Sequence, residues 1–203
     1  GGQRAGQFLH LTVDPYDPSG FWPDSRVFSI ASSPRDRGRV RVCYSVKGRY
    51  TTKMEHTLRP GGSVWIKLPY GEFVIGDAED VVLLAGGTGI SAFTAFLEAL
   101  PPETTRRVWL AYGVRDPSLF LFREMIQSQL ARVPAFQAIW FAETGAAPSM
   151  RAGRISLDVL FEQPEAAARV ANAVFYLSGP PVMLKTLAAG LSARGVSAGR
   201  IRT

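Results

Sequence analysis

The chain has 203 residues, 46% of them hydrophobic, which is enough to bury a substantial core in one large domain or two small ones. Its single cysteine excludes an internal disulfide and any zinc or iron–sulfur site that needs several thiolates. The net charge is +6, but the basic residues are scattered rather than gathered in a tract, so nucleic-acid binding is not indicated.

Other sequence signals narrow the class of protein further. No apolar run reaches the roughly 18 residues that a membrane-spanning helix needs, and the N-terminus has no apolar signal-peptide core. The two histidines, His10 and His56, are far apart and lack the spacing of metal ligands, so we expect no metal site. We expect a cytoplasmic protein, or the cytoplasmic-side domain of a larger one.

The first part of the chain has the pattern of short strands. Residues 8–13, 26–32, 39–46 and 63–68 are rich in β-branched and aromatic residues and are separated by Pro, Gly and Asp. One helix is predicted at residues 50–58, just before a PGG turn. This pattern predicts an all-β antiparallel barrel or sandwich.

From residue 77 onward, apolar strands alternate with helices. The predicted strand and helix pairs are 81–85 with 91–100, 108–114 with 119–133, 136–141 with 156–161, and 174–178 with 181–193. Such alternation indicates an α/β domain with a parallel sheet covered on both faces. We therefore expect two domains, residues 1–76 and residues 77–203.

The two ends of the sequence suggest that each domain is incomplete. The chain begins close to GQF at residues 6–8 without a full strand before it, and it ends as a further strand begins near residue 201. We expect the first strand of the barrel and the C-terminal end of the α/β domain to be incomplete.

The segment GGTGI at residues 86–90 lies between a predicted strand and a predicted helix. Glycines there let backbone N–H groups approach phosphate oxygens, and the helix N-terminus adds partial positive charge. The dinucleotide fingerprint also requires an acidic residue about 20 positions further on, and VWLAYGV at residues 108–114 offers none. Alone, the motif is also compatible with a tight turn that binds no ligand.

Three further segments carry polar groups suited to cofactor binding. They are SGPPVM at residues 178–183, RVFS at 26–29 and GRYTT at 48–52. A guanidinium can grip a phosphate, an aromatic ring can lie against a flat heterocycle, and a Gly with hydroxyls at a helix start can cradle phosphate. Each has a structural alternative: a helix start, a chance pattern in a strand, or an N-cap by Thr51 or Thr52.

Taken in order, these motifs resemble the ferredoxin–NADP⁺ reductase superfamily of flavin-dependent reductases that use pyridine nucleotides. The resemblance also includes GQF at residues 6–8, PGG at 60–62, PYGEF at 69–73 and YGVR at 112–115, and it covers nearly the whole chain. It implies a Greek-key flavin-binding barrel followed by a parallel-sheet nucleotide-binding domain.

The resemblance also implies roles for individual residues. Arg26 would neutralise a flavin phosphate, Phe28 would pack on the flavin ring, and Ser29 and Ser178 would stand at the catalytic positions. The implied cofactor-binding set is Arg26, Phe28, Ser29, Tyr44, Gly48, Tyr50, Thr51, Thr52, Gly87, Thr88, Gly89, Gly113, Arg115, Glu143, Ser178, Gly179, Pro180 and Met183.

The chain departs from the family pattern at two of these positions. The family usually has Tyr where this chain has Phe28, so one hydroxyl contact is lost while the stacking surface remains. Many relatives have Cys where this chain has Ser178, and serine is less polarisable. We expect hydride transfer to work, at a lower rate.

In this family the adenosine ribose is recognised from the end of the third strand of the nucleotide domain. Residues 140–144 there read WFAET, and the Glu143 carboxylate suits a free ribose diol and would repel a 2′-phosphate. This favours NADH over NADPH. The alternatives are a solvated strand-end Glu143, or a phosphate bound by Arg151 or Arg154.

The implied function is hydride transfer from NAD(P)H to a flavin, FAD rather than FMN, followed by electron delivery to an acceptor. The acceptor would be an iron–sulfur or haem protein or a fused domain, with an acidic surface to match the basic chain. Two alternatives are the reductase part of a larger oxygenase reductase, flavohaemoglobin or ferric reductase, and a non-catalytic flavin- or nucleotide-binding regulatory module.

Overall fold

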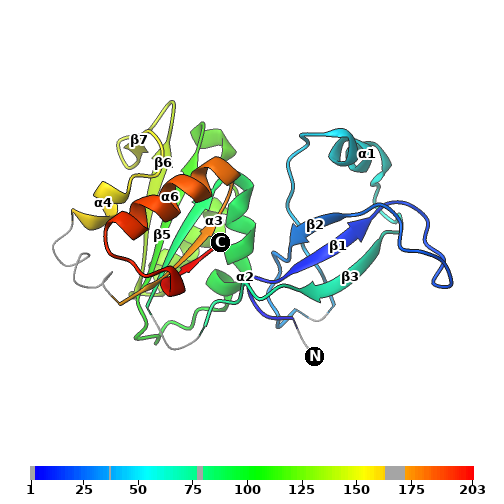
Figure 1. The fold of residues 1–203 in the computed structure, drawn as a ribbon, viewed down its shortest axis with the longest axis horizontal. Coiled ribbons are helices and arrows are strands. Elements are labelled where there is room, and N and C mark those ends of the chain that lie inside the picture. The colour runs from blue at the N-terminus through cyan, green and yellow to red at the C-terminus, as the bar shows by residue number, and fades with distance from the viewer. Residues whose placement is uncertain (1–2, 37, 77–79, 163–171) are drawn as a thin grey trace.

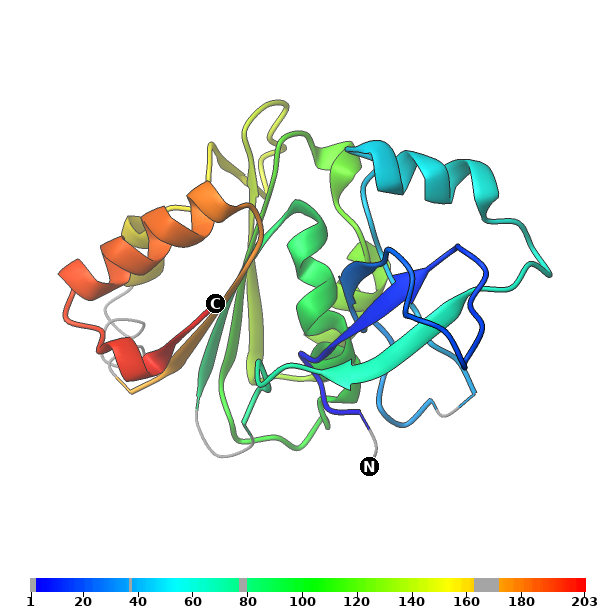
Figure 2. The same cartoon turned by 45° about the vertical axis from the view of Figure 1, so that its right-hand side comes forward.

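The computed structural model describes residues 3–36, 38–76, 80–162 and 172–203, and these form two parts that lie side by side (Figure 1). The N-terminal part contains a three-stranded antiparallel sheet, and the C-terminal part contains a six-stranded parallel sheet. Helix α2 (Ser91–Ala99) lies between the two parts in both views (Figures 1 and 2). The expected fold class, an antiparallel β domain followed by a parallel α/β domain, is confirmed.

The antiparallel sheet has the strand order β2-β1-β3. Its elements are β1 (Phe8–Thr12), β2 (Arg26–Ser29) and β3 (Trp65–Tyr70), and helix α1 (Arg49–Thr57) covers it. Successive residues of a strand point to opposite faces, so Leu9 and Leu11 lie on the same face, where they pack with Ile30 and with Met54 of α1. This small core fixes α1, and with it the chain just before α1, against the sheet.

The prediction of a strand at residues 39–46 is wrong, because this described segment belongs to no strand. The Ala31 N–H donates to the Arg41 carbonyl at 2.8 Å, and the Arg41 N–H donates to Ser32 Oγ at 3.2 Å. A strand needs a regular ladder with a neighbour, and β1 already has β2 and β3 on its two sides. The alternating valines gave this segment the side-chain pattern of a strand, but no neighbouring strand is available to pair with it.

The parallel sheet has the order β7-β6-β5-β4-β8-β9, and each neighbouring pair is parallel. Its strands are β4 (Val81–Gly86), β5 (Val108–Val114), β6 (Phe136–Ala142), β7 (Arg151–Ala152), β8 (Val174–Ser178) and β9 (Ile201–Arg202). The other elements are α3 (Arg123–Arg132), α4 (Leu157–Phe161), α6 (Pro181–Ala193) and the 3₁₀ turns η1 (Gly87–Ile90), η2 (Pro117–Leu119) and η3 (Ala198–Arg200).

Strand β4 shows why the sheet is covered on both faces, since all six of its residues are buried. Leu83 belongs to the core that includes residues of α2 and α3, whereas Leu84 belongs to the core that includes residues of α4 and α6. Neighbouring residues of one strand therefore face two different cores, as a parallel sheet requires.

Helix α3 is shorter than the predicted helix at residues 119–133. The chain first makes the turn η2, and Phe122 then adopts a left-handed conformation with φ 56°. A left-handed residue cannot continue a right-handed helix, so α3 begins at Arg123.

The two parts contact each other through α2. Thr94 Oγ1, which is fully buried, donates to the Ala31 carbonyl at 2.8 Å, and Arg41 pairs with Glu98 at 3.0 Å. The boundary predicted between residues 76 and 77 adjoins residues 77–79, which lie outside the described residues. We keep that boundary as a proposal, since Gly76 follows the antiparallel part and β4 begins at Val81.

Candidate cofactor-binding cleft

The strand order of the parallel sheet predicts where a ligand would bind. β4 comes first in this part of the chain and has β5 on one side and β8 on the other, so the chain changes direction across the sheet at β4. Ligands of such sheets bind outside the carboxyl ends of the strands at this switch point. The segments there are the turn after β4 and the turn after β8.

These two turns touch each other. A Cβ on Gly89 would lie 2.2 Å from the Ser178 carbonyl oxygen, and one on Gly179 would lie 2.6 Å from Met183 Cε. Gly87 has φ 54°, which glycine adopts easily, and a Cβ added there would meet nothing within 4 Å. The loop is therefore packed tightly against the Ser178 turn and open at Gly87.

A cleft of about 450 Å³ opens at this point and is lined by residues of both parts of the chain. From the antiparallel part come Val27, Phe28, Ser29, Cys43, Tyr44, Ser45, Lys47 and Thr51. From the parallel-sheet part come Gly86, Gly87, Thr88, Gly89, Ser91, Ser178, Gly179, Pro180 and Pro181. Both predicted catalytic positions, Ser29 and Ser178, thus line the same cleft from opposite parts.

The wall supplied by the antiparallel part is aromatic and polar. The rings of Phe28 and Tyr44 lie 5.7 Å apart at an angle of 51° and are both half-buried. Burial raises the pKa of the Cys43 thiol beside them. The thiol therefore stays protonated near neutral pH and belongs to the lining rather than to a nucleophile.

The start of α1 lies beside this wall. Thr51 Oγ1 accepts hydrogen bonds from the N–H groups of Lys47 (3.0 Å) and Gly48 (3.2 Å). The Thr51 hydroxyl therefore caps the helix by reaching back to the two residues that precede it. Gly48 has open space around it, and Thr52 is exposed, so the helix start can still be approached by an anion.

Four of the predicted flavin-binding residues, Arg26, Gly48, Tyr50 and Thr52, do not line the cleft. Arg26 pairs with Asp24 at 2.6 Å, and its guanidinium lies 4.3 Å from the centre of the Tyr50 ring. Tyr50 is buried, and its hydroxyl hydrogen-bonds the Asp24 carbonyl at 3.0 Å and the Val13 N–H at 3.3 Å. In this structure Arg26 and Tyr50 hold the loop before β2 in place.

Four further predicted residues, Met183, Gly113, Arg115 and Glu143, are not among the residues that line the cleft. Met183 lies under the turn, since a Cβ on Gly86 would meet its sulfur at 2.5 Å, and Gly113 lets Ile155 pack closely over β5. Arg115 and Glu143 are exposed beyond the ends of β5 and β6. Glu143 is paired with Arg154 at 3.3 Å, and the side chains are 41% and 81% exposed.

The sequence motifs missed several residues of the lining. Cys43, Ser45 and Lys47 come from the segment before α1, where they alternate along the chain. That alternation, leading directly to Gly48, was a usable signal. Val27, Gly86 and Pro181 lie inside the quoted motifs but were given no role, and Ser91 directly follows the GGTGI motif.

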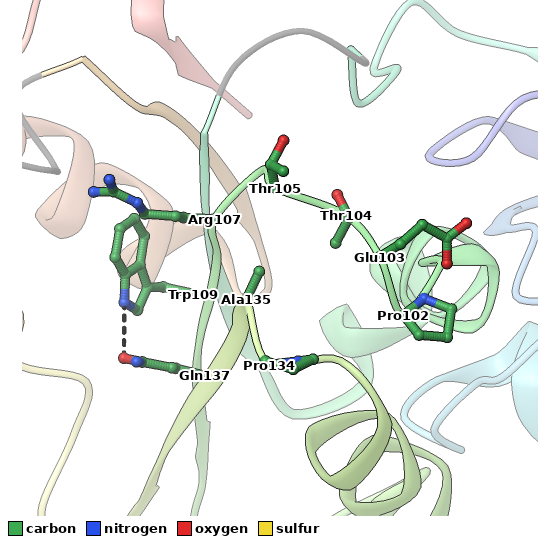
Figure 3. Close-up of a pocket in the computed structure, with 9 residues that line it drawn as sticks. All are labelled: Pro102, Glu103, Thr104, Thr105, Arg107, Trp109, Pro134, Ala135 and Gln137. Atoms are coloured by element: carbon green, nitrogen blue, oxygen red, sulfur yellow. Dashed lines mark hydrogen bonds between the residues drawn. The ribbon is translucent and has the colours of Figure 1, made fainter.

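A second hollow lies at the opposite edge of the parallel sheet (Figure 3). It has a volume of about 360 Å³ and is lined by Trp109, Gln137, Arg107 and neighbouring loop residues. Trp109 Nε1 donates to Gln137 Oε1 at 3.1 Å, so the main polar groups of the floor are already paired with each other. The hollow lies at the amino ends of β5 and β6, away from the switch point, and we do not assign it to the cofactor.

The described ranges contain neither a metal-binding cluster nor a membrane-spanning helix. No group of three or more His, Cys, Asp or Glu side chains suitable for a metal ion occurs among residues 3–36, 38–76, 80–162 and 172–203. In the same part of the chain, no helix has the length and apolar character needed to cross a bilayer.

The chain matches known proteins along most of its length. The family described as the oxidoreductase NAD-binding domain matches residues 83–189. The reductase component of phenol 2-monooxygenase from Pseudomonas sp. (strain CF600) is 29% identical over 67% of this chain and 38% of that protein. The flavohemoprotein of Bordetella pertussis is 25% identical over 97% of this chain and 51% of that protein. The chain therefore spans between about two fifths and one half of these relatives.

Solved structures show the same fold. The flavohaemoglobin-like FAD/NAD-binding domain of nitric oxide dioxygenase from Vibrio cholerae superposes with a TM-score of 0.80 at 21% identity. The match covers 98% of this chain and 84% of that one. At this identity the likeness concerns the fold, and it includes both the antiparallel and the parallel-sheet parts.

Proposed function

This chain belongs to the oxidoreductase NAD-binding domain family, and we propose that it passes hydride from NAD(P)H to a flavin and then electrons to an acceptor. One observation carries the proposal: residues of both parts of the chain line one cleft, with Ser29 and Phe28 on one wall and Gly87–Gly89 and Ser178 on the other. When bound, the flavin supplies the redox chemistry by accepting a hydride and releasing electrons to the next centre.

The antiparallel wall fits a flavin, and we favour FAD over FMN. Phe28 and Tyr44 offer an aromatic surface for a flat ring system, and Ser29 offers a hydroxyl beside it. Lys47, Gly48 and the start of α1 offer positive charge and open space for phosphate. Arg26 can join them only by exchanging Asp24 for a phosphate, because its guanidinium is now bound to that carboxylate.

The opposite wall fits a nicotinamide nucleotide. The turn after β4 presents backbone groups at Gly87, Thr88 and Gly89, and the contact between Gly89 and Ser178 fixes the two turns to each other. Ser178 would then orient the nicotinamide by hydrogen bonding, and the packed turns would exclude water from the reacting atoms. We propose no general acid or base for this step.

We propose a preference for NADH that is set by Glu143 and moderated by Arg154. Glu143 is close to half exposed, so a 2′-phosphate beside it would meet a carboxylate that Arg154 only partly neutralises. Glu143→Ser should raise the ratio of NADPH to NADH use by about three- to tenfold, because it removes the repulsion and frees Arg154 for the phosphate. Steady-state kcat/KM for both nucleotides measures the change.

Two controls make this test decisive. Glu103→Ser removes an acidic residue at the opposite edge of the sheet (Figure 3) and should leave the ratio unchanged. The double variant Glu143→Ser with Arg154→Ser should lose most of the gain. An unchanged ratio in the Glu143→Ser protein would show that this carboxylate takes no part in nucleotide choice.

We propose that the acceptor is an iron–sulfur or haem protein, or a domain of the same larger protein, with an acidic surface. Residues 1–76 carry eleven Lys or Arg against six Asp or Glu, whereas residues 77–203 carry twelve against eleven. The excess positive charge thus lies in the part that would hold the flavin, where it would steer an acidic partner. Electron transfer to an acidic [2Fe–2S] protein should slow as salt is raised, and transfer to neutral benzoquinone should not.

The central experiment is an anaerobic titration of the flavin-reconstituted protein with NADH. The flavin absorbance should bleach, and Phe28→Ala should weaken flavin binding at least tenfold because it removes the aromatic wall, whereas Phe21→Ala should not, since Phe21 is fully exposed. Failure to bind FAD or FMN would refute the proposal. Flavin binding without bleaching would favour the non-catalytic regulatory module instead.

A further inference from the structure

Residues 71–76, which follow β3 and which we call the connector, are packed on both sides. Phe73, three residues after β3 ends, lies 5.5 Å from Tyr176 of β8 in an edge-to-face contact and 6.1 Å from Phe93 of α2. On its other side, the carbonyl oxygen of Phe73 approaches Gly6 so closely that a Cβ there would lie 2.0 Å away. The connector therefore has little room to shift without disturbing one of the two parts.

Tyr176 adds hydrogen bonds to this packing. Its hydroxyl accepts from the Gly76 N–H at 3.2 Å and donates to the Val74 carbonyl at 3.2 Å. The side chain is only 4% exposed. One buried hydroxyl thus pairs with both a donor and an acceptor of the connector backbone.

The position of Tyr176 in β8 links the connector to the cleft. Tyr176 pairs with Leu83 of β4, and Ser178, two residues later, pairs with Ala85. Ser178 then enters the turn that contacts Gly89 and lines the cleft. Strand β8 therefore contacts the connector through Tyr176 and contributes to the nucleotide-side wall of the cleft through Ser178, two residues further on.

We propose that Tyr176 is a positioning residue that fixes the separation between the flavin-side and nucleotide-side walls of the cleft. This inference rests on the proposed hydride transfer. The connector follows β3, which is joined through β1 to β2 and so to Ser29. Tyr176 ties that antiparallel sheet to the strand that ends at Ser178. Hydride transfer depends steeply on the separation and orientation of donor and acceptor, whereas binding of each cofactor to its own wall does not.

Other links should keep the two parts folded together when the hydroxyl is removed. Thr94 binds the Ala31 carbonyl and Arg41 pairs with Glu98, both through α2 rather than through the connector. Tyr176→Phe also keeps the ring and its contact with Phe73. The variant therefore loosens the connector without opening the whole contact between the two parts.

The test compares Tyr176→Phe with Tyr112→Phe in the flavin-reconstituted chain. Tyr112 is a similarly buried tyrosine of the same sheet, but the hydrogen bond that its hydroxyl accepts from the Leu121 N–H at 3.1 Å lies within the parallel-sheet part. Stopped-flow measurements give the limiting rate of flavin reduction at saturating NADH, and separate titrations give the dissociation constants of flavin and of NADH.

We expect Tyr176→Phe to lower the limiting rate by about ten- to hundredfold. Both dissociation constants should stay within about twofold of wild type, and the deuterium isotope effect with 4-deuterated NADH should change. Tyr112→Phe should keep the wild-type rate and isotope effect. A second variant, Phe73→Leu, loosens the same connector from its ring contact and should lower the rate in the same direction.

The possible outcomes separate this inference from the proposed function. A wild-type protein that binds flavin and bleaches, with both connector variants reduced as fast as wild type, overturns the positioning role and leaves the proposed function intact. Equal losses of rate in the Tyr176→Phe and Tyr112→Phe proteins would also overturn it, since they would reflect general destabilisation. A wild-type protein that cannot bind flavin overturns both.

Discussion

Gly89 is the residue at which the two turns of the parallel sheet meet, and it offers the sharpest prediction for a single side chain. A Cβ there would lie 2.2 Å from the Ser178 carbonyl oxygen, a backbone atom that cannot rotate away. Gly89→Ala should therefore push the turns apart, cost about 2 kcal/mol of the free energy of unfolding, and weaken NADH binding by at least tenfold. Urea unfolding and an NADH titration measure the two effects.

The matched control is Gly199→Ala. Nothing lies within 4 Å of a Cβ at Gly199, which is far from the cleft in sequence and belongs to η3. The Gly199→Ala variant should change neither the free energy of unfolding nor the affinity for NADH. If the Gly89→Ala protein binds NADH as wild type does, the contact between the turns has no part in forming the site.

Tyr112 gives a prediction about alkaline pH. Burial raises its pKa from 10.0 to about 12, although the Leu121 N–H bond acts in the opposite direction. The unfolded chain ionises this tyrosine near pH 10 and the folded chain does not. The contribution of the neutral tyrosine to the free energy of unfolding is therefore fully present below pH 10 and is lost between pH 10 and 12. The loss is at most about 3 kcal/mol.

Comparison with Tyr112→Phe isolates this contribution. The free energy of unfolding of the variant, measured in urea at pH 9, 10 and 11, should fall less steeply than that of wild type. Parallel curves for the two proteins would mean that Tyr112 ionises equally in the folded and unfolded states.

Single residues of the cleft were predictable where the chemistry and the strand pattern agreed. The structure brings Phe28, Ser29, Gly87 and Gly89 to one cleft, and the two glycines lie there because they follow the carboxyl end of the parallel strand β4. Their binding of cofactors stays a prediction. Arg26 and Tyr50 are not among the lining residues, because the Arg26 guanidinium pairs with the Asp24 carboxylate and the Tyr50 hydroxyl donates to the Asp24 carbonyl. Sequence gives the residue type but not the competing contact within the folded chain.

At the scale of elements, we propose that the start of α1 both stabilises the helix and binds flavin phosphate, and substitutions of two neighbouring threonines separate these two functions. Thr51→Val removes the hydroxyl that accepts from the Lys47 and Gly48 N–H groups, so it should cost about 1 kcal/mol of stability and weaken flavin binding. Thr52→Val should leave stability unchanged, since Thr52 is exposed. It should weaken flavin binding only if its hydroxyl contacts the phosphate.

Thermal unfolding of the flavin-free protein and flavin titration distinguish the two threonines. If Thr51→Val leaves both the melting temperature and the flavin affinity unchanged, the hydrogen bonds at the helix start contribute to neither. Loss of affinity in the Thr52→Val protein without loss of stability would assign the exposed hydroxyl to the phosphate.

Elements with a complete local signal were predicted closely. The strand β8 and the helix α6 begin and end where the sequence placed them, since a continuous apolar run and a proline mark their boundaries. The segment 39–46 failed because a strand depends on a partner that local sequence does not contain. Helix α3 begins late because Phe122 takes a left-handed conformation, which its side chain gave no reason to expect.

For the whole molecule, the question is whether the two parts behave as one cooperative unit. The contact through α2 contains a fully buried hydroxyl, Thr94, which donates to the Ala31 carbonyl at 2.8 Å. Thr94→Val keeps the volume but leaves this carbonyl without its partner, which should cost about 1–3 kcal/mol. This loss weakens the contact between the two parts. The temperature at which the antiparallel part releases flavin should therefore fall below the temperature at which the parallel sheet unfolds.

Thermal denaturation followed by both flavin absorbance and far-ultraviolet circular dichroism tests this prediction. Wild type should give coincident transitions, which is the sign of a single cooperative unit, and Thr94→Val should separate them. Glu98→Gln is the control, because the partly exposed pair of Glu98 with Arg41 is worth no more than about 1 kcal/mol. Coincident transitions in the Thr94→Val protein would show that the connector anchored by Tyr176, rather than α2, couples the two parts.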